Sequence, residues 1–224
     1  MDVYLEVGTK RVFAGALQWP GWCRSARDEG EALSTFFGYA GRYAQVVEGT
    51  DLRPALVVPK RAADLRIVER LTGDATTDFG APSGAPAVDL MSVKPSDLRD
   101  LLAILQACWG ALDRAAASAV GVELTKGPRG GGRDLAAILE HVRSAEASYA
   151  RRIAIRPAPD LSPDASSRRA ALRASLLDGL TRAVTEGIPP VGPRGGVMWT
   201  PRYLVRRAAW HVLDHAWEIE DRSS

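Results

Sequence analysis

The chain has 224 residues, which is enough for one large domain or two small ones. It is 46% hydrophobic and 25% charged, so it can bury its own core, and its net charge of +2 excludes the strongly basic composition typical of nucleic-acid-binding proteins. No segment has the roughly 18 apolar residues of a membrane span, and the first residues do not form a secretion signal, so a cytoplasmic protein without membrane association is expected.

Residues 1–71 are predicted to form a small α/β domain. Strands are indicated where apolar and polar residues alternate, and a helix where apolar residues recur every three or four positions. The first two strands are joined by a Gly8-Thr9 turn and should pair as a hairpin. The expected elements are a strand at 3–7, a strand at 11–19, a helix at 28–47, a strand at 55–58 and, at 65–71, a strand with a helix as the alternative.

Residues 72–95 are rich in Gly, Pro and Thr and show no periodicity, which indicates a linker. Residues 96–224 contain four amphipathic segments and are predicted to form a four-helix bundle. Ser96 is expected to cap the first of these helices, and Thr200 the fourth, with Pro201 at its first position. The predicted fold class is therefore α+β, a small α/β domain followed by a helical bundle.

Motifs that would indicate several other functions are absent from the sequence. Cys23 and Cys108 lie far apart and neither belongs to a CxxC pair, so both are expected to be buried thiols in a reducing compartment. The glycine-rich segments 128–133 and 192–196 lack the GxxxxGK[ST] pattern of a phosphate-binding loop and are interpreted as helix connections. There is no GxSxG sequence of a serine hydrolase.

The three histidines of the chain, His141, His211 and His215, fall on two predicted helices. His211 and His215 are four residues apart, so their imidazoles project from one helix face, which they share with Leu204 and Ala208. His141 lies on an apolar stripe of the second helix. Burying an unpaired imidazole costs roughly 1–3 kcal/mol, so three inward histidines predict a shared metal ion, with hydrogen-bonded core histidines as the alternative.

The ligand set indicates which metals and which helper residues to expect. Imidazole suits Zn, Ni, Cu or Fe(II), and three ligands leave a position open for water or substrate, as in catalytic zinc sites. Glu218 follows His215 by three residues and could accept a hydrogen bond from a ligand, bind the metal or carry a proton. Arg207, one turn before His211, is a candidate for binding an anionic substrate. The alternatives are a surface carboxylate for Glu218 and a solvated arginine for Arg207.

The histidine-bearing helices resemble those of the DinB-like (YfiT-like) four-helix bundle superfamily. The resemblance covers about residues 95–222 and is carried by Leu135-Ala-Ala-Ile-Leu-Glu-His141 with Glu146 beyond it, and by Ala208-Ala-Trp-His211-Val-Leu-Asp-His215. It implies a divalent metal, zinc or nickel, bound by the three histidines. It also implies a thiol-dependent S-transferase or isomerase activity with mycothiol, bacillithiol or glutathione as cosubstrate.

The first domain resembles the small α/β module of HicB proteins. The resemblance is carried by the hairpin from Tyr4 to Gln18, by Trp19-Pro-Gly-Trp-Cys-Arg-Ser, and by the following Glu31-Ala-Leu helix. HicB antitoxins usually carry a DNA-binding segment, and none is visible in this sequence. A lid over the second domain or a homodimerisation surface is therefore the expected role.

The sequence is compatible with three functional hypotheses. The first is a metal-dependent enzyme that joins a thiol to a small-molecule substrate, with Glu218 and Arg207 as helper residues. The second is a non-catalytic metal-binding or regulatory protein that uses the HicB-like domain as its partner interface. The third is an antitoxin-like role linked to DNA. The sequence does not indicate the substrate.

Overall fold

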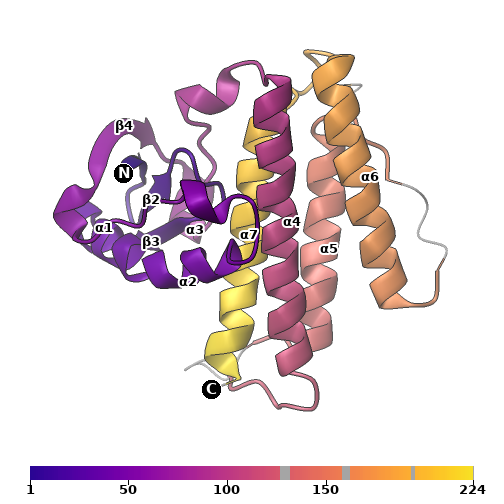
Figure 1. Cartoon of the computed structure of the whole chain (residues 1–224), viewed down its shortest axis with the longest axis horizontal. Helices are drawn as coiled ribbons and strands as arrows, with labels where there is room; N and C mark the ends of the chain where they lie inside the picture. Colours follow the sequence, from indigo (N-terminus) through magenta and orange to yellow (C-terminus); the bar gives the residue numbers. More distant parts are fainter. Residues whose placement is uncertain (127–131, 158–161, 193–194, 224) are drawn as a thin grey trace.

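The computed structural model describes residues 1–126, 132–157, 162–192 and 195–223, so the glycine-rich connections 128–133 and 192–196 lie partly outside the described residues. A small sheet with short helices lies beside four long helices, which confirms the α+β class (Figure 1). The elements in chain order are β1 (Asp2–Val7), β2 (Val12–Ala16), β3 (Cys23–Ala26), α1 (Glu29–Gly38), α2 (Ala40–Val46), the 3-10 helices η1 (Arg53–Ala55) and η2 (Ala62–Asp64), β4 (Arg66–Thr72), α3 (Ala75–Phe79), the 3-10 helix η3 (Ala87–Leu90), α4 (Pro95–Ser118), α5 (Leu135–Arg151), α6 (Ala165–Thr185) and α7 (Pro201–Arg222).

The sheet has the strand order β3-β2-β1-β4. β2 is antiparallel to β1 and β3, and β4 is parallel to β1, so the predicted hairpin and the predicted strand at 65–71 are confirmed. Every residue of β2 is buried, since α1 packs against β2 and β3, and Trp210 of α7 contacts Phe13 of β2. On the α7 side, the rings of Phe13 and Trp210 meet edge to face with their centroids 6.1 Å apart.

Two predicted elements of the N-terminal part differ from the structure. The helix expected at 28–47 is two helices, α1 and α2, which separate at Tyr39 directly after Gly38, a residue that weakens helix continuation. The strand expected at 55–58 is wrong. The chain instead forms η1, with Pro54 in its first turn, which takes Ala55 into the 3-10 helix, and then runs without regular structure.

The segment 72–95, predicted to be a linker, contains α3 and η3 and packs against the sheet. The buried carboxylate of Glu6 in β1 accepts hydrogen bonds from the backbone N–H groups of Ser83 (2.8 Å) and Gly84 (2.9 Å). Asp89 in η3 is also buried. Glu6 binds the backbone of the segment, and Asp89 forms an ion pair with Arg206 of α7. These contacts of buried carboxylates hold the segment at a fixed position over one face of the sheet.

The four long helices α4 to α7 lie side by side, as predicted (Figure 1). The Thr200 hydroxyl accepts the backbone N–H of Tyr203 (3.2 Å) and Pro201 opens α7, which confirms the predicted start of this helix. The predicted cap at Ser96 is wrong. α4 begins one residue earlier at Pro95, whose missing N–H costs nothing in a first turn, so Ser96 lies inside the helix.

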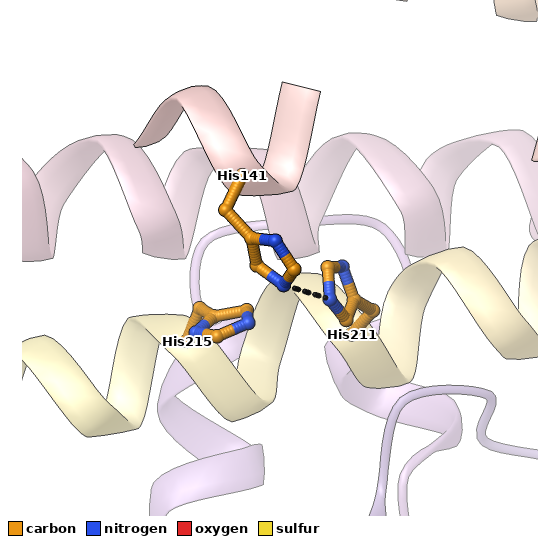
Figure 2. Close-up of side chains that lie close together, drawn as sticks. All are labelled: His141, His211 and His215. Carbon is orange, nitrogen blue, oxygen red and sulfur yellow. Dashed lines mark hydrogen bonds between the residues drawn. The ribbon is translucent and has the colours of Figure 1, made fainter. Parts of the chain in front are cut away.

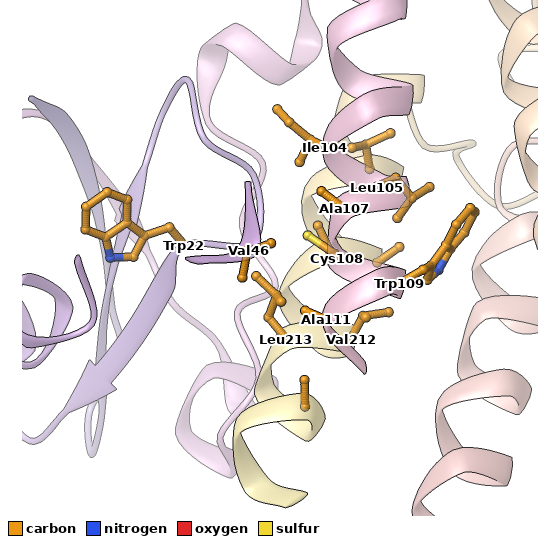
Figure 3. Packing of buried hydrophobic residues seen from close by; sticks show 14 of the residues in the cluster. Trp22, Val46, Ile104, Leu105, Ala107, Cys108, Trp109, Ala111, Val212 and Leu213 are labelled. Atoms are coloured by element: carbon orange, nitrogen blue, oxygen red, sulfur yellow. The ribbon is translucent and has the colours of Figure 1, made fainter. Parts of the chain in front are cut away.

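One hydrophobic core joins the N-terminal part to the long helices. Figure 3 shows apolar side chains of α2, α4 and α7 in one cluster, with Val46, Cys108 and Leu213 among them. Gly21 permits this approach, because its φ is +96° and a Cβ at this position would lie 2.9 Å from Cδ1 of Leu213. α7 therefore packs against both halves of the protein.

Two expectations drawn from composition can be compared with the structure. Cys23 and Cys108 are free and buried, as predicted. Burial raises the pKa of the Cys23 thiol to about 12, so this residue is an unreactive core thiol. None of the helices described is both long enough and apolar enough to cross a membrane.

Candidate metal centre

The three histidines meet at one point between α5 and α7 (Figure 2). One ligand nitrogen from each ring can be chosen so that all three lie within 4.8 Å of one another. Nε2 of His141 is 3.2 Å from Nε2 of His211. Two nitrogens bound tetrahedrally to one zinc at 2.0–2.1 Å would be about 3.3 Å apart, so this spacing suits a shared ion. The group could hold a metal ion.

The local sequence explains how the rings come together. The i, i+4 spacing on α7 places His211 and His215 one turn apart, on a helix whose neighbouring Leu204 and Ala208 are fully buried. His211 is 7% exposed and His215 is 8% exposed, whereas His141 on α5 is half-buried. The ring of His141 is therefore the one closest to solvent.

Burial and neighbouring charges keep two of the imidazoles neutral. Desolvation, followed by the nearby His215, His141 and Arg207, lowers the pKa of His211 to about 2. Burial and then the charge of Arg133 lower the pKa of His141. Neutral imidazole is the form that binds metal, so both rings are in the ligand state at pH 7 without losing a proton.

The hydrogen bonding of His211 favours a metal site over ordinary core histidines. Its Nδ1 atom is buried and has no hydrogen-bond partner among the described residues. Its Nε2 atom faces only Nε2 of His141. Hydrogen-bonded core histidines would satisfy their ring nitrogens with protein acceptors or donors, and this ring does not. A donor set of three imidazole nitrogens fits Zn²⁺ or Ni²⁺.

Glu218 orients one of the candidate ligands. Its Oε2 atom accepts a hydrogen bond from Nδ1 of His215 (2.7 Å), which leaves Nε2 of that ring free for a metal. Its Oε1 atom accepts a hydrogen bond from Nη1 of Arg222 (2.7 Å), and Arg222 Nε donates to the carbonyl of Thr125 (2.9 Å). The hydrogen bond from His215 lowers the pKa of Glu218, so the carboxylate is ionised. Of the three predicted roles for Glu218, this arrangement favours accepting a hydrogen bond from a ligand.

Replacing Glu218 with alanine is expected to weaken zinc binding by about 10- to 100-fold, because the His215 ring loses the acceptor that fixes its tautomer and direction. Glu218→Gln retains an acceptor and should lose less. Competition with a chromophoric chelator at pH 7 measures both affinities. Asp221→Asn, at the same helix end and paired with Arg42, is the control and should bind zinc like the wild type. Equal affinity for Glu218→Ala and the control would contradict this role.

Arg207 lies beside the histidines and is not simply solvated. Its guanidinium carbon is 4.7 Å from the ring centroid of Trp210 and 5.6 Å from that of Tyr149. Both rings are also neighbours of the His211 ring, at 6.0 Å and 5.9 Å between centroids. The side chain is half-buried, and its role in binding an anion stays a prediction.

Sequence reasoning missed several neighbours of the histidines. Tyr149 is one of them: it lies on α5 about two turns beyond His141, and its ring is 5.9 Å from that of His211 between centroids. Arg222, which holds Glu218, gave no signal in the sequence. Glu146, which belongs to the motif quoted above, does not join the cluster. It is buried and accepts a hydrogen bond from Trp109 Nε1, and burial raises its pKa to about 7.

Comparisons with known proteins identify no relative of this chain. No protein-family model matches the chain, and neither a curated protein nor a solved structure shows significant similarity to it. The functional assignment therefore depends on the fold and on the geometry of the three histidines.

Proposed function

We propose that the chain is a metal-dependent enzyme of the DinB-like four-helix bundle superfamily, which joins a low-molecular-weight thiol to a small electrophilic substrate. The observation that carries the proposal is the convergence of His141, His211 and His215 from α5 and α7. Three protein ligands leave at least one coordination position for the thiol, as in catalytic zinc sites. Zinc or nickel is the expected ion.

The residues of the site supply positioning and charge for this chemistry. A bound divalent ion would lower the pKa of the thiol, as zinc does for water. Imidazole ligands would bring no negative charge to the ion, and Glu218 accepts the hydrogen bond from Nδ1 of His215, which leaves Nε2 directed to the site. In the transfer, the thiol loses its proton to solvent and its sulfur forms a bond to the electrophilic carbon. With an alkyl halide the carbon–halogen bond breaks and the halide departs with the electron pair; with an epoxide the carbon–oxygen bond breaks and the oxygen keeps the pair and takes up a proton from solvent.

Turnover with defined thiols tests the proposal. The zinc- or nickel-loaded protein is incubated with mycothiol, bacillithiol or glutathione and a panel of alkyl halides and epoxides, and mass spectrometry detects the thioether product. We expect product formation that stops on chelation, returns with added metal, and is absent in His215→Ala. If the fully metal-loaded protein gives no product with any of the three thiols, the enzymatic proposal is wrong.

A further inference from the structure

One arginine of α7 differs from the others. Three of the four arginines of this helix are ion-paired: Arg202 with Asp97, Arg206 with Asp89, and Arg222 with Glu218. Arg207 forms neither a hydrogen bond nor an ion pair with any part of the chain that the structure describes, and its Nη1 atom is buried without an acceptor. Buried donors in folded proteins are almost always hydrogen-bonded, so this guanidinium requires an explanation.

Aromatic rings hold the Arg207 guanidinium and leave its donors available. Trp210 and Tyr149 contact it through cation–π interactions, at 4.7 Å and 5.6 Å from the guanidinium carbon to the ring centroids. Such contacts use the faces of the planar group, whereas its five N–H bonds point outward in the plane. An arginine oriented in this way matches the two oxygens of a carboxylate.

The charges around the histidines also favour an anion. Arg207 and Arg133 both lie close enough to lower the pKa of His211 by their charge. Among the described residues, Glu218 is the carboxylate that contacts the group of three histidines. It already accepts hydrogen bonds from His215 and Arg222. The surroundings of the histidines are therefore positive before any metal binds, and a divalent ion would add two further charges.

We propose that Arg207, which contacts the rings of Tyr149 and Trp210, binds a carboxylate group on one of the two reactants, so that the enzyme acts on an organic acid. This inference rests on the proposed function for the reaction and adds the charge of the ligand. The carboxylate belongs either to the thiol or to the electrophile. In both cases it lies at Arg207 while the reacting atom faces the three histidines.

Matched pairs of probes test this assignment on the cobalt-loaded protein. The thiol arm compares 3-mercaptopropionate with the uncharged 3-mercaptopropionamide through the thiolate-to-cobalt charge-transfer band. The other arm compares benzoate with the isosteric benzamide by calorimetry, with and without saturating 2-mercaptoethanol. We expect the carboxylate of at least one pair to bind about 10- to 100-fold more tightly than its amide, and the arm that shows this identifies which reactant carries the acid.

Variants connect the preference to Arg207. Arg207→Gln should abolish it without changing the affinity of the amides, and Arg207→Lys, which keeps the charge but not the planar fork, should retain part of it. Arg152→Gln removes another arginine that contacts an aromatic ring, Trp199 at 5.6 Å, and should behave like the wild type. Circular dichroism and cobalt content verify that each variant is folded.

The outcomes separate the two proposals. If no thiol binds but benzoate binds in an Arg207-dependent way, also without metal, the anion site is supported and the thiol chemistry is wrong. If the thiols bind but neither pair distinguishes carboxylate from amide, the anion site is overturned and the thiol chemistry stands. An equal preference in the wild type and in Arg207→Gln would likewise overturn it.

Discussion

The affinity for zinc is expected to fall by more than about 100-fold when His211 is replaced with alanine. This loss is larger than the roughly 10- to 100-fold loss that usually follows when a residue hydrogen-bonded to a metal ligand is removed. Two imidazoles would remain, and the nitrogen that lies 3.2 Å from Nε2 of His141 would be lost. Atomic emission after dialysis measures the zinc content, and chelator competition measures the affinity. Zinc should also stabilise the wild type, by about 4 kcal/mol at a thousandfold excess over Kd, and not the variant.

A second variant distinguishes ligand loss from misfolding. His141→Ala removes a half-buried ring from the other helix, where truncation disturbs the core less, and should cause a similar loss of zinc. Ser144→Ala, one turn further along α5 and exposed, is the matched control and should bind zinc normally. Wild-type zinc content in either histidine variant would show that this ring is not a ligand.

The second large effect is on stability. Arg206 and Asp89 form an ion pair with side chains only 6% and 3% exposed, and Arg206 Nη2 is 2.9 Å from Oδ1 of Asp89. The same guanidinium donates to the carbonyls of Ala16 (2.7 Å) and Leu17 (2.8 Å) at the end of β2. Asp89→Ala is expected to lower the free energy of unfolding by about 3–5 kcal/mol, because the arginine would remain buried without its counter-charge. Urea denaturation measures the change.

Two further variants define this effect. Asp178→Ala removes the exposed pair with Arg182 and should change the stability by no more than about 0.5 kcal/mol. Replacing both partners, Arg206→Met with Asp89→Leu, removes the uncompensated charge and should be less destabilising than Asp89→Ala alone. A loss for Asp89→Ala as small as that for Asp178→Ala would show that the buried pair does not hold the structure together.

The parts of the fold that depend on local patterns were predictable. Apolar residues at intervals of three and four residues identified all four long helices, and Thr200 with Pro201 marked the start of α7. The packing of segment 72–95 was not predictable, because Glu6 meets Ser83 and Asp89 meets Arg206 across long stretches of sequence. Local periodicity carries no information about which distant partner a buried carboxylate will find.

In the candidate site, too, the features that depend on local spacing were predictable and those that depend on contacts between distant segments were not. The spacing of His211 and His215 predicted two rings on one face, since helix geometry alone determines this. That His141 would meet them depended on α5 lying against α7, which the sequence indicated through the apolar stripes of a predicted bundle and through a resemblance, and not through any local spacing. The contact of Arg207 with Trp210 follows the i, i+3 spacing of α7, whereas its contact with Tyr149 joins α7 to α5 and could not be inferred from the spacing within either helix.

α7 carries two of the candidate ligands and is at the same time fixed by the opposite end of the chain. The carbonyls of Ala16 and Leu17 hold Arg206, which lies five residues before His211 on this helix. The direction in which the two imidazoles point is thus set partly by the β2 end of a hairpin that lies outside the histidine cluster. A fragment restricted to the four long helices would lose this constraint, and affinity for zinc becomes a sensitive measure of whether the N-terminal sheet is correctly docked.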